Sequence, residues 1–128
     1  MEKSYRTPLR FASGSGSTRS GTAHWWRQRV SAAALIPLVL WLALSVTHLP
    51  DATHAEIVQW LALPWNTLAL FSLLVLVFYH AAIGIQVVIE DYVHVRAFKY
   101  FGLVAIQLLL LLLASLAVYA LIRIVLKG

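Results

Sequence analysis

The chain has no cysteine among its 128 residues. It therefore forms no disulfide, offers no thiolate to a metal and holds no iron–sulfur cluster on its own. Charge is also scarce, at 12% of residues, with five acidic side chains in the whole sequence. Neither a nucleophile triad, nor a glycine-rich phosphate loop, nor a cluster of metal-binding carboxylates is found in it. We therefore expect no catalytic residues on this chain.

What the sequence does contain is apolar. Hydrophobic residues make up 61% of the chain and its mean hydropathy is +0.80, too apolar for a soluble domain of this size. The net charge is +5. The basic residues flank the apolar runs instead of forming a patch, so membrane topology explains them better than a nucleic-acid partner does. The composition predicts a membrane protein.

Three runs without a formal charge divide the chain: residues 30–49, 65–89 and 100–122, with 20, 25 and 23 residues. A helix needs about 20 apolar residues to cross roughly 30 Å of hydrocarbon, so each run is long enough. We predict an all-α membrane protein with three transmembrane helices. Residues 1–21, rich in Ser, Gly and Arg, are predicted to be a flexible cytoplasmic arm, and residues 22–128 a membrane anchor domain.

The distribution of basic residues predicts the orientation. Three spans put the N-terminal arm and the second connecting loop on one side of the membrane, with eight basic residues against two on the other. The positive-inside rule places the richer side in the cytoplasm and the C-terminus in the periplasm. We expect a bacterial inner membrane. The alternative is the mitochondrial inner membrane, since the N-terminal arm is also rich in Arg and Ser and poor in acid.

A single histidine, His80, lies deep inside the second apolar run. A ring nitrogen at that depth has no water to bond, so it needs a neighbouring helix or a metal. Gly84, one turn further along, leaves one side of the helix bare, which suits a close helix crossing or a flat macrocycle. The residues alone allow three hypotheses about the role of His80: a structural hydrogen bond, a haem ligand or a proton relay.

The end of the same run supplies a more specific pattern. It reads His80-Ala-x-x-Gly84-x-x-x-Val88-x-x-Asp91-Tyr92-Val93. This stretch resembles the signature of the small hydrophobic membrane anchor, the D subunit, of succinate dehydrogenase (respiratory complex II). Residues 21–32 carry a weaker part of the resemblance, and the layout of three spans agrees with it.

The resemblance implies roles for particular residues. His80 would be an axial ligand of a b-type haem, and Tyr92, with Asp91 beside it, would close a ubiquinone site. Considered without the family, Tyr92 reads as one of the tyrosines that gather at membrane interfaces. With the family, we read it as a phenol that donates a hydrogen bond to a quinone carbonyl, because a group with a pKa near ~10 stays protonated at neutral pH.

The resemblance also implies partners. The chain would join a cytochrome b-type anchor subunit in a larger helical bundle and attach the iron–sulfur and flavoprotein subunits to the membrane. His80 supplies one axial bond, and none of the other four histidines is predicted at its depth. A haem with two histidine ligands would therefore be shared with the partner anchor.

Arg29 stands at the membrane boundary, where a guanidinium can form bidentate pairs with carboxylates. The family has an arginine at a matching place, which implies contact with a haem propionate. The plainer reading of Arg29 is a positive-inside anchor. His24 matches the family pattern poorly, and its role stays open.

Two rival functions remain. One is the anchor of a fumarate reductase that runs the opposite reaction, which these residues do not distinguish. The other is a haem-free assembly or transporter accessory subunit, in which His80 only bonds a neighbouring helix.

Overall fold

The computed structural model describes residues 18–127, and almost all of this range is helical. The element order is α2 (Thr18–Val46), α3 (His54–Ala62), α4 (Pro64–Tyr92) and α5 (Arg96–Lys127). α4 and α5 contain the second and third predicted apolar runs, α2 contains the first except for residues 47–49, and all three helices are long and apolar enough to cross a membrane. The prediction of an all-α membrane protein with three spans is confirmed.

Each long helix continues beyond its charge-free run. The first run was predicted to span residues 30–49, whereas α2 begins at Thr18 and ends at Val46. The predicted N-terminal arm lies outside the described residues except for its last four, 18–21, which belong to α2. A charge-free run marks the part of a helix that lies in hydrocarbon, and charged turns of the same helix reach into the headgroups. The helices are longer than the runs for this reason.

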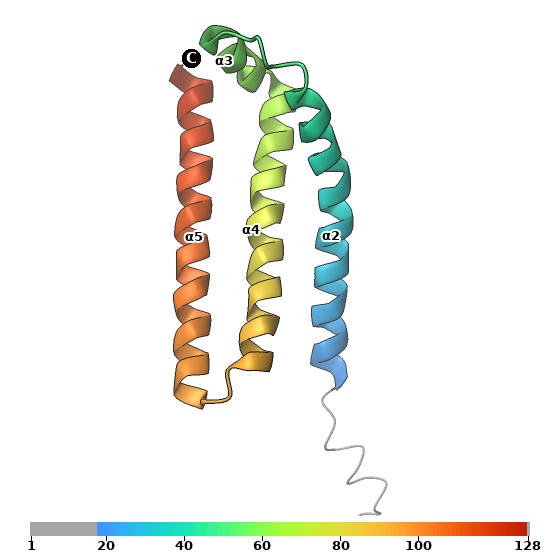
Figure 1. Ribbon diagram of the computed structural model, residues 1–128, viewed down its shortest axis with the longest axis vertical. Coiled ribbons are helices and arrows are strands. Elements are labelled where there is room, and N and C mark those ends of the chain that lie inside the picture. Colours follow the sequence, from blue (N-terminus) through green and yellow to red (C-terminus); the bar gives the residue numbers. More distant parts are fainter. Residues whose placement is uncertain (1–17, 128) are drawn as a thin grey trace, which may run out of the picture.

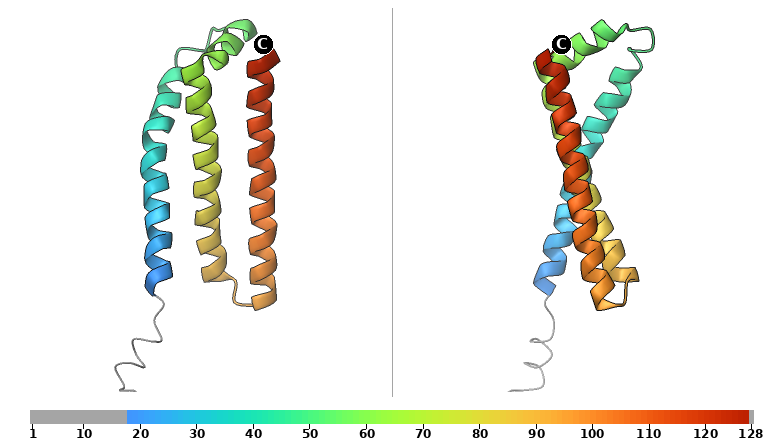
Figure 2. Two further views of the ribbon diagram at one scale, coloured as in Figure 1. Left: turned by 180° about the vertical axis from the view of Figure 1, so that it is seen from behind. Right: turned by 90° about the vertical axis from the view of Figure 1, so that its left-hand side faces the viewer.

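The long helices lie side by side in a row with α4 in the middle (Figure 1). α4 packs against α2 on one side and α5 on the other, and α2 and α5 do not touch. Seen from the side, α2 crosses the other two helices at an angle (Figure 2). The closest approach of α2 and α4 is therefore restricted to part of their length.

The two ends of the row differ. The start of α2 and the short connection between α4 and α5 lie at one end, and α3 lies at the other, beside the end of α5 (Figure 1). This agrees with the predicted sidedness of the loops. Pro37 lies inside α2, which continues through it as a gently curved helix. Proline is tolerated in membrane helices, and a mild bend is its usual effect.

α3 closes the end of the row opposite the α4–α5 connection. Its first turn is held by a capping box, in which the Thr53 amide and hydroxyl donate to the Glu56 carboxylate at 2.7 Å each. These two hydrogen bonds hold the pKa of Glu56 below its ordinary value of 4.5. The Trp41 ring of α2 stacks on the Trp60 ring of α3 at 5.8 Å. The capping box and the stacked rings keep α3 against the ends of the spans.

The row of helices buries very little. Among residues 21–127, for which burial is described, only Leu73, Ile83, Leu121 and Ser31 are buried. Three helices in a row have no enclosed core, so most of their large apolar side chains remain exposed to lipid or to other helices. Ser31, at 3% exposure, is the one buried polar residue in the described part of the chain.

Candidate functional site

The His80 ring lies against α2, and both of its nitrogens have a polar neighbour there. Nδ1 is 2.9 Å from the Ser31 hydroxyl oxygen, and Nε2 is 3.4 Å from the Gln28 amide nitrogen. The Ser31 hydroxyl donates to the backbone carbonyl of Gln28 at 3.0 Å. The ring, the hydroxyl and the amide form one connected polar cluster, His80–Ser31–Gln28, between two apolar helices.

The donors of this cluster determine where the ring proton sits. An amide NH₂ group only donates, so Nε2 of His80 accepts from Gln28. When the single hydroxyl proton of Ser31 goes to the Gln28 carbonyl, the Ser31 oxygen accepts from Nδ1–H. This arrangement of the two contacts corresponds to the tautomer with the proton on Nδ1 and the lone pair on Nε2. This is the neutral form in which an imidazole binds a metal through Nε2.

Gly84 faces α2 at the helix crossing. A Cβ atom at this position would lie 3.5 Å from the Gln28 amide nitrogen, an ordinary van der Waals contact. Of the two predicted uses of its bare side, the close helix crossing is the one that the structure contains. A small residue at such a crossing lets the backbones come near enough for side-chain hydrogen bonds between spans.

An apolar groove opens on another side of His80. It has a volume of about 430 Å³ and is lined, besides His80, by five residues of α2: Ala32, Leu35, Ile36, Val39 and Leu40. His80 itself is partly exposed. An apolar groove with one polar nitrogen heterocycle at its wall matches the usual make-up of a cofactor site, which is mostly apolar with few polar groups.

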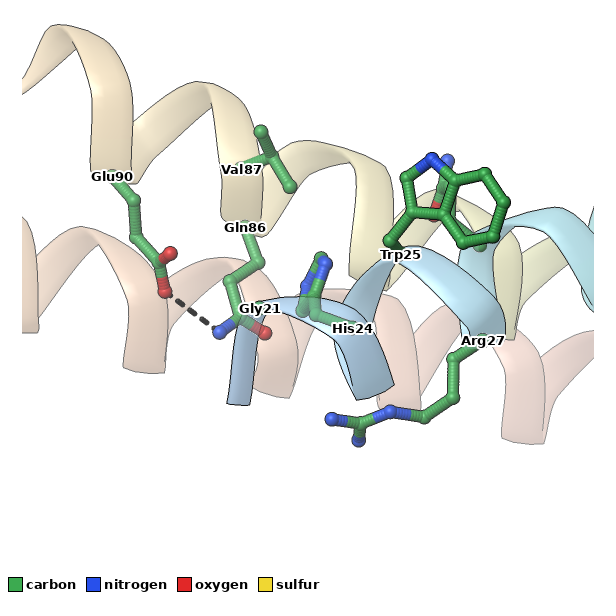
Figure 3. Close-up of a pocket in the computed structure, with 8 residues that line it drawn as sticks. Gly21, His24, Trp25, Arg27, Gln86, Val87 and Glu90 are labelled. Carbon is green, nitrogen blue, oxygen red and sulfur yellow. Dashed lines mark hydrogen bonds between the residues drawn. The ribbon is translucent and has the colours of Figure 1, made fainter. Parts of the chain in front are cut away.

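A second, polar cavity lies between α2 and α4 nearer the start of α2, with a volume of about 540 Å³. Figure 3 shows His24 of α2 and Gln86 and Glu90 of α4 at its walls. Gln86 donates to the Glu90 carboxylate at 2.7 Å, while Nε2 of His24 and Oε1 of Gln28 are buried without a hydrogen-bond partner. Buried polar atoms of this kind normally bind water or a ligand group.

Arg29 is exposed, and its guanidinium stacks over the Trp25 ring, 5.3 Å from the centroid. It lines neither the groove beside His80 nor the polar cavity, where Arg27 is found instead. Stacking uses the face of the guanidinium and leaves the N–H groups at its edge directed outward. The structure does not bring Arg29 close to His80. The Arg29 side chain lies on the outer surface of α2, so the predicted contact with a haem propionate would be made there.

Asp91 and Tyr92 form the last turn of α4, and both are exposed. Tyr92 is 79% exposed, and its backbone carbonyl oxygen lies 3.1 Å from Nδ1 of His94. Twelve residues separate Tyr92 from His80, about 18 Å along a helix. The predicted quinone residues are therefore at the membrane boundary, at the end of the row where α2 begins.

No group of three or more His, Asp or Glu side chains in residues 18–127 is placed to hold a metal ion. His80 thus stands as a single nitrogen donor. The sequence analysis missed Ser31 and Gln28, because the register of α2 against α4 is not visible in one sequence. The available signal was Ser31 itself, a hydroxyl inside a charge-free run, since such groups often bond across membrane helices.

Comparisons with known proteins agree with the layout. The sequence matches the family described as succinate dehydrogenase/fumarate reductase transmembrane subunit over residues 3–122. The succinate dehydrogenase hydrophobic membrane anchor subunit of Rickettsia bellii is 34% identical over 109 residues, 84% of this chain and 86% of the relative. The corresponding subunit of Rickettsia felis is 36% identical over 90 residues, 70% of this chain and 74% of the relative.

A third relative is the succinate dehydrogenase membrane anchor subunit of Reclinomonas americana, 34% identical over 80 residues, which are 60% of this chain and 67% of the relative. No solved structure gives a significant match. Because the family match covers nearly the whole chain, this chain belongs to the family of succinate dehydrogenase and fumarate reductase transmembrane subunits.

Proposed function

We propose that the chain is the hydrophobic membrane anchor of a succinate:quinone oxidoreductase, in which His80 is one axial ligand of a b-type haem. The observation that carries the proposal is the position of His80, whose ring lies at the wall of an apolar groove of about 430 Å³ with Nδ1 2.9 Å from the Ser31 hydroxyl oxygen. An intramembrane histidine is a functional candidate by default, because its burial in hydrocarbon is costly.

The residues present fit a haem. The macrocycle is flat and apolar, as is the lining of the groove next to His80. Nε2 would be the donor atom, because its contact with Gln28 is the longer one at 3.4 Å, while Nδ1 lies 2.9 Å from a hydroxyl oxygen, an arrangement common to metal-ligating histidines. When bound, the haem supplies one-electron redox chemistry within the membrane. The chain contributes the donor nitrogen, its orientation and an apolar wall.

Among the described residues His80 is the one histidine that lines the groove, so a second haem ligand would come from another subunit. A row of three helices with little buried surface also leaves long apolar faces for other spans. Both points support a shared haem in a bundle with a cytochrome b-type partner anchor. The iron–sulfur and flavoprotein subunits would dock on this pair and carry out succinate oxidation, for which this chain has no catalytic residues.

Ubiquinone is proposed to bind at the membrane boundary near Tyr92. The Tyr92 phenol is exposed at the end of α4 and is available to donate a hydrogen bond to a quinone carbonyl. Asp91, also exposed beside it, would deliver protons or orient basic neighbours. This end of the row carries most of the basic residues, so we place it, and the docking face, in the cytoplasm of a bacterium.

Arg29 is proposed to hold a haem propionate through the edge of its guanidinium while its face remains on Trp25. His24 lines the polar cavity with an unpartnered Nε2 and would reach an anionic or water ligand there. These two assignments concern different surfaces of α2, so they are tested separately from His80.

One specific observation favours a second candidate. Ser31 and Gln28 already give each nitrogen of His80 a neighbour, which is what a haem-free helical accessory subunit would require. The 3.4 Å contact to Gln28 is long for a hydrogen bond, however, so Nε2 is the less tightly held nitrogen. A fumarate reductase anchor would have the same haem-binding residues and differ in the direction of the reaction.

The test is the reduced-minus-oxidised absorption spectrum of the complex purified with its natural partners. A b-type spectrum is expected in the wild type, and His80→Ala should lose it while the subunits remain assembled. His54→Ala is the matched control, because His54 is exposed at the start of α3, and it should retain the spectrum. A wild-type complex without the spectrum would favour the haem-free accessory subunit, and a spectrum that survives His80→Ala would remove His80 from the iron.

A further inference from the structure

We infer that Ser31 is the positioning residue for His80: its hydroxyl oxygen accepts the Nδ1–H bond, holds the ring in one tautomer and tunes the metal to which Nε2 binds. The effect on the metal rests on the proposed haem. The part that concerns the tautomer depends only on side chains of this chain.

The environment of Ser31 makes this role specific. It is 3% exposed, the least exposed polar residue among residues 21–127, and its hydroxyl oxygen lies 2.9 Å from Nδ1 of His80. Serine inside a membrane helix commonly returns its hydroxyl proton to a carbonyl in the preceding turn, and here it does so to Gln28 at 3.0 Å. With its only proton on that carbonyl, the hydroxyl oxygen accepts from the ring, and this is the arrangement on which the inference is built.

The neighbouring groups leave His80 no equivalent substitute. Gln28 is the other polar contact of the ring, and its amide nitrogen is a donor, which occupies Nε2 and not Nδ1. Gln28 Oε1 is buried without a partner, so in this arrangement the amide does not accept from His80. Without the Ser31 hydroxyl, Nδ1–H would be a buried donor lacking a partner, a costly state in hydrocarbon.

An acceptor on Nδ1–H has a defined effect on a metal at Nε2. It raises the basicity of the ligating nitrogen and fixes the ring orientation, and loss of such a partner commonly lowers metal affinity by 10–100-fold. A more basic nitrogen favours the more positively charged, oxidised iron. Removing the hydroxyl should therefore favour reduced iron and raise the midpoint potential of the haem.

The first test is a redox titration of the b-type haem in the purified complex. We expect Ser31→Ala to raise the midpoint potential, with a tenfold shift in the oxidised-to-reduced ratio corresponding to ~59 mV for a one-electron couple. Ser31→Thr keeps the hydroxyl and should stay near the wild type. Ser115→Ala is the matched control, because Ser115 also bonds back to a carbonyl, Leu111, but lies exposed on α5.

Each result decides the question. An unchanged potential in Ser31→Ala would overturn the inference. Loss of haem in Ser31→Ala that is rescued in Ser31→Thr supports it. Loss in both variants, with Ser115→Ala intact, would mean that the small volume of Ser31 matters and its hydroxyl does not, and would also overturn it.

The second test needs no haem, so it separates this inference from the proposed function. The full chain, labelled with ¹⁵N-histidine and reconstituted in lipid bilayers, is measured by solid-state NMR, and His80 is assigned by comparison with His80→Ala. We expect the Nδ1–H tautomer in the wild type and in Ser31→Thr, and the Nε2–H tautomer in Ser31→Ala. Finding the same tautomer in the wild type and in Ser31→Ala would overturn the inference even if the haem proposal holds.

Discussion

The two helix contacts of α4 differ in chemistry. Toward α2 it makes the polar cluster of His80, Ser31 and Gln28, inside the membrane. Toward α5 the contact is apolar along the spans, and in the described residues the one side-chain hydrogen bond between these two helices is at their end, from Lys99 Nζ to the Glu90 carbonyl at 2.7 Å.

The two contacts of α4 therefore differ in role: we assign the proposed site to the contact with α2 and helix packing alone to the contact with α5. Hydrogen bonds between membrane helices are worth only about 0.6–2 kcal/mol, and apolar packing alone holds α5 in place. A polar cluster inside the membrane is therefore not needed to keep two helices together. Its presence between α2 and α4 is the reason why we propose the site at that contact.

The largest effect is expected from replacing one glycine in each of the two contacts with a larger residue. Gly84 faces Gln28 across the α2–α4 contact, while a Cβ at Gly102 of α5 would lie 4.0 Å from an Ile89 methyl group. Gly84→Leu should force α2 away at a cost of about 1–3 kcal/mol and lower the haem content of the complex. Gly102→Leu meets a flexible apolar side chain and should leave haem content near the wild type.

Haem content per assembled complex is the measurement, from the absorption of extracted haem relative to protein. If the two leucine variants lost haem equally, the polar contact would have no special part in the site and the comparison would fail.

A second prediction concerns two exposed tyrosines at the same end of the row. Tyr92 ends α4 and Tyr100 lies near the start of α5, at 79% and 67% exposure. Tyr92→Phe removes the proposed hydrogen bond to quinone and should slow quinone reduction on the order of tenfold, the value of about 1.4 kcal/mol. Tyr100→Phe should change it little.

Succinate oxidation with a soluble artificial acceptor serves as the internal control, since it bypasses the membrane site. It should be unchanged in both phenylalanine variants. A parallel loss of both activities in Tyr92→Phe would point to failed assembly and would remove the assignment of Tyr92 to quinone.

A third and smaller effect tests the one polar link between α4 and α5. Lys99→Met removes a cation that bonds a carbonyl in the last turn of α4, an interaction worth about 0.3–1 kcal/mol. Amide hydrogen exchange should speed up by a few-fold at the end of α4, around residues 90–93. Lys127→Met, in the last turn of α5, is the control. Loss of haem in Lys99→Met would contradict the view of this contact as framework.

The smallest effect lies outside both contacts, in the capping box of α3. The pKa of Glu56 is lowered by hydrogen bonds from Thr53, so the folded state favours the carboxylate. The stabilisation that the ionised Glu56 carboxylate gives to the capping box is complete above the ordinary pKa of 4.5. It is lost as the pH falls through the lowered pKa of the folded state. Amide exchange in the first turn of α3 should therefore rise as the pH falls through this lowered pKa, relative to Glu56→Gln, which does not titrate. Identical pH profiles in the two proteins would contradict this.

The sequence allowed the spans to be predicted because hydrocarbon excludes charge over a fixed thickness, and the three charge-free runs record that thickness directly. It did not allow the helix ends to be placed, since α2 carries Arg27 and Arg29 and α4 carries Glu90 and Asp91 beyond the hydrocarbon. Helical propensity and headgroup contacts decide those turns, and neither depends on the absence of charge.

The site was predictable in the same uneven way. His80 was found because a titratable ring in hydrocarbon is conspicuous in any sequence. Ser31 and Gln28 were not found, since their importance depends on the crossing of α2 over α4. This crossing brings them into contact with His80, from which they are separated by 49 and 52 positions in the sequence. Serine and glutamine near a membrane boundary are ordinary, and only the geometry distinguishes these two.

The most direct test of the central claim is the structure of the purified complex, determined by electron cryo-microscopy in a lipid disc. The account predicts a macrocycle against the groove of Ala32 to Leu40, iron bonded to His80 Nε2 and Nδ1 still bonded to the Ser31 hydroxyl. A complex with its subunits assembled, His80 bonded only to Ser31 and Gln28, and lipid or a side chain in the groove would contradict it.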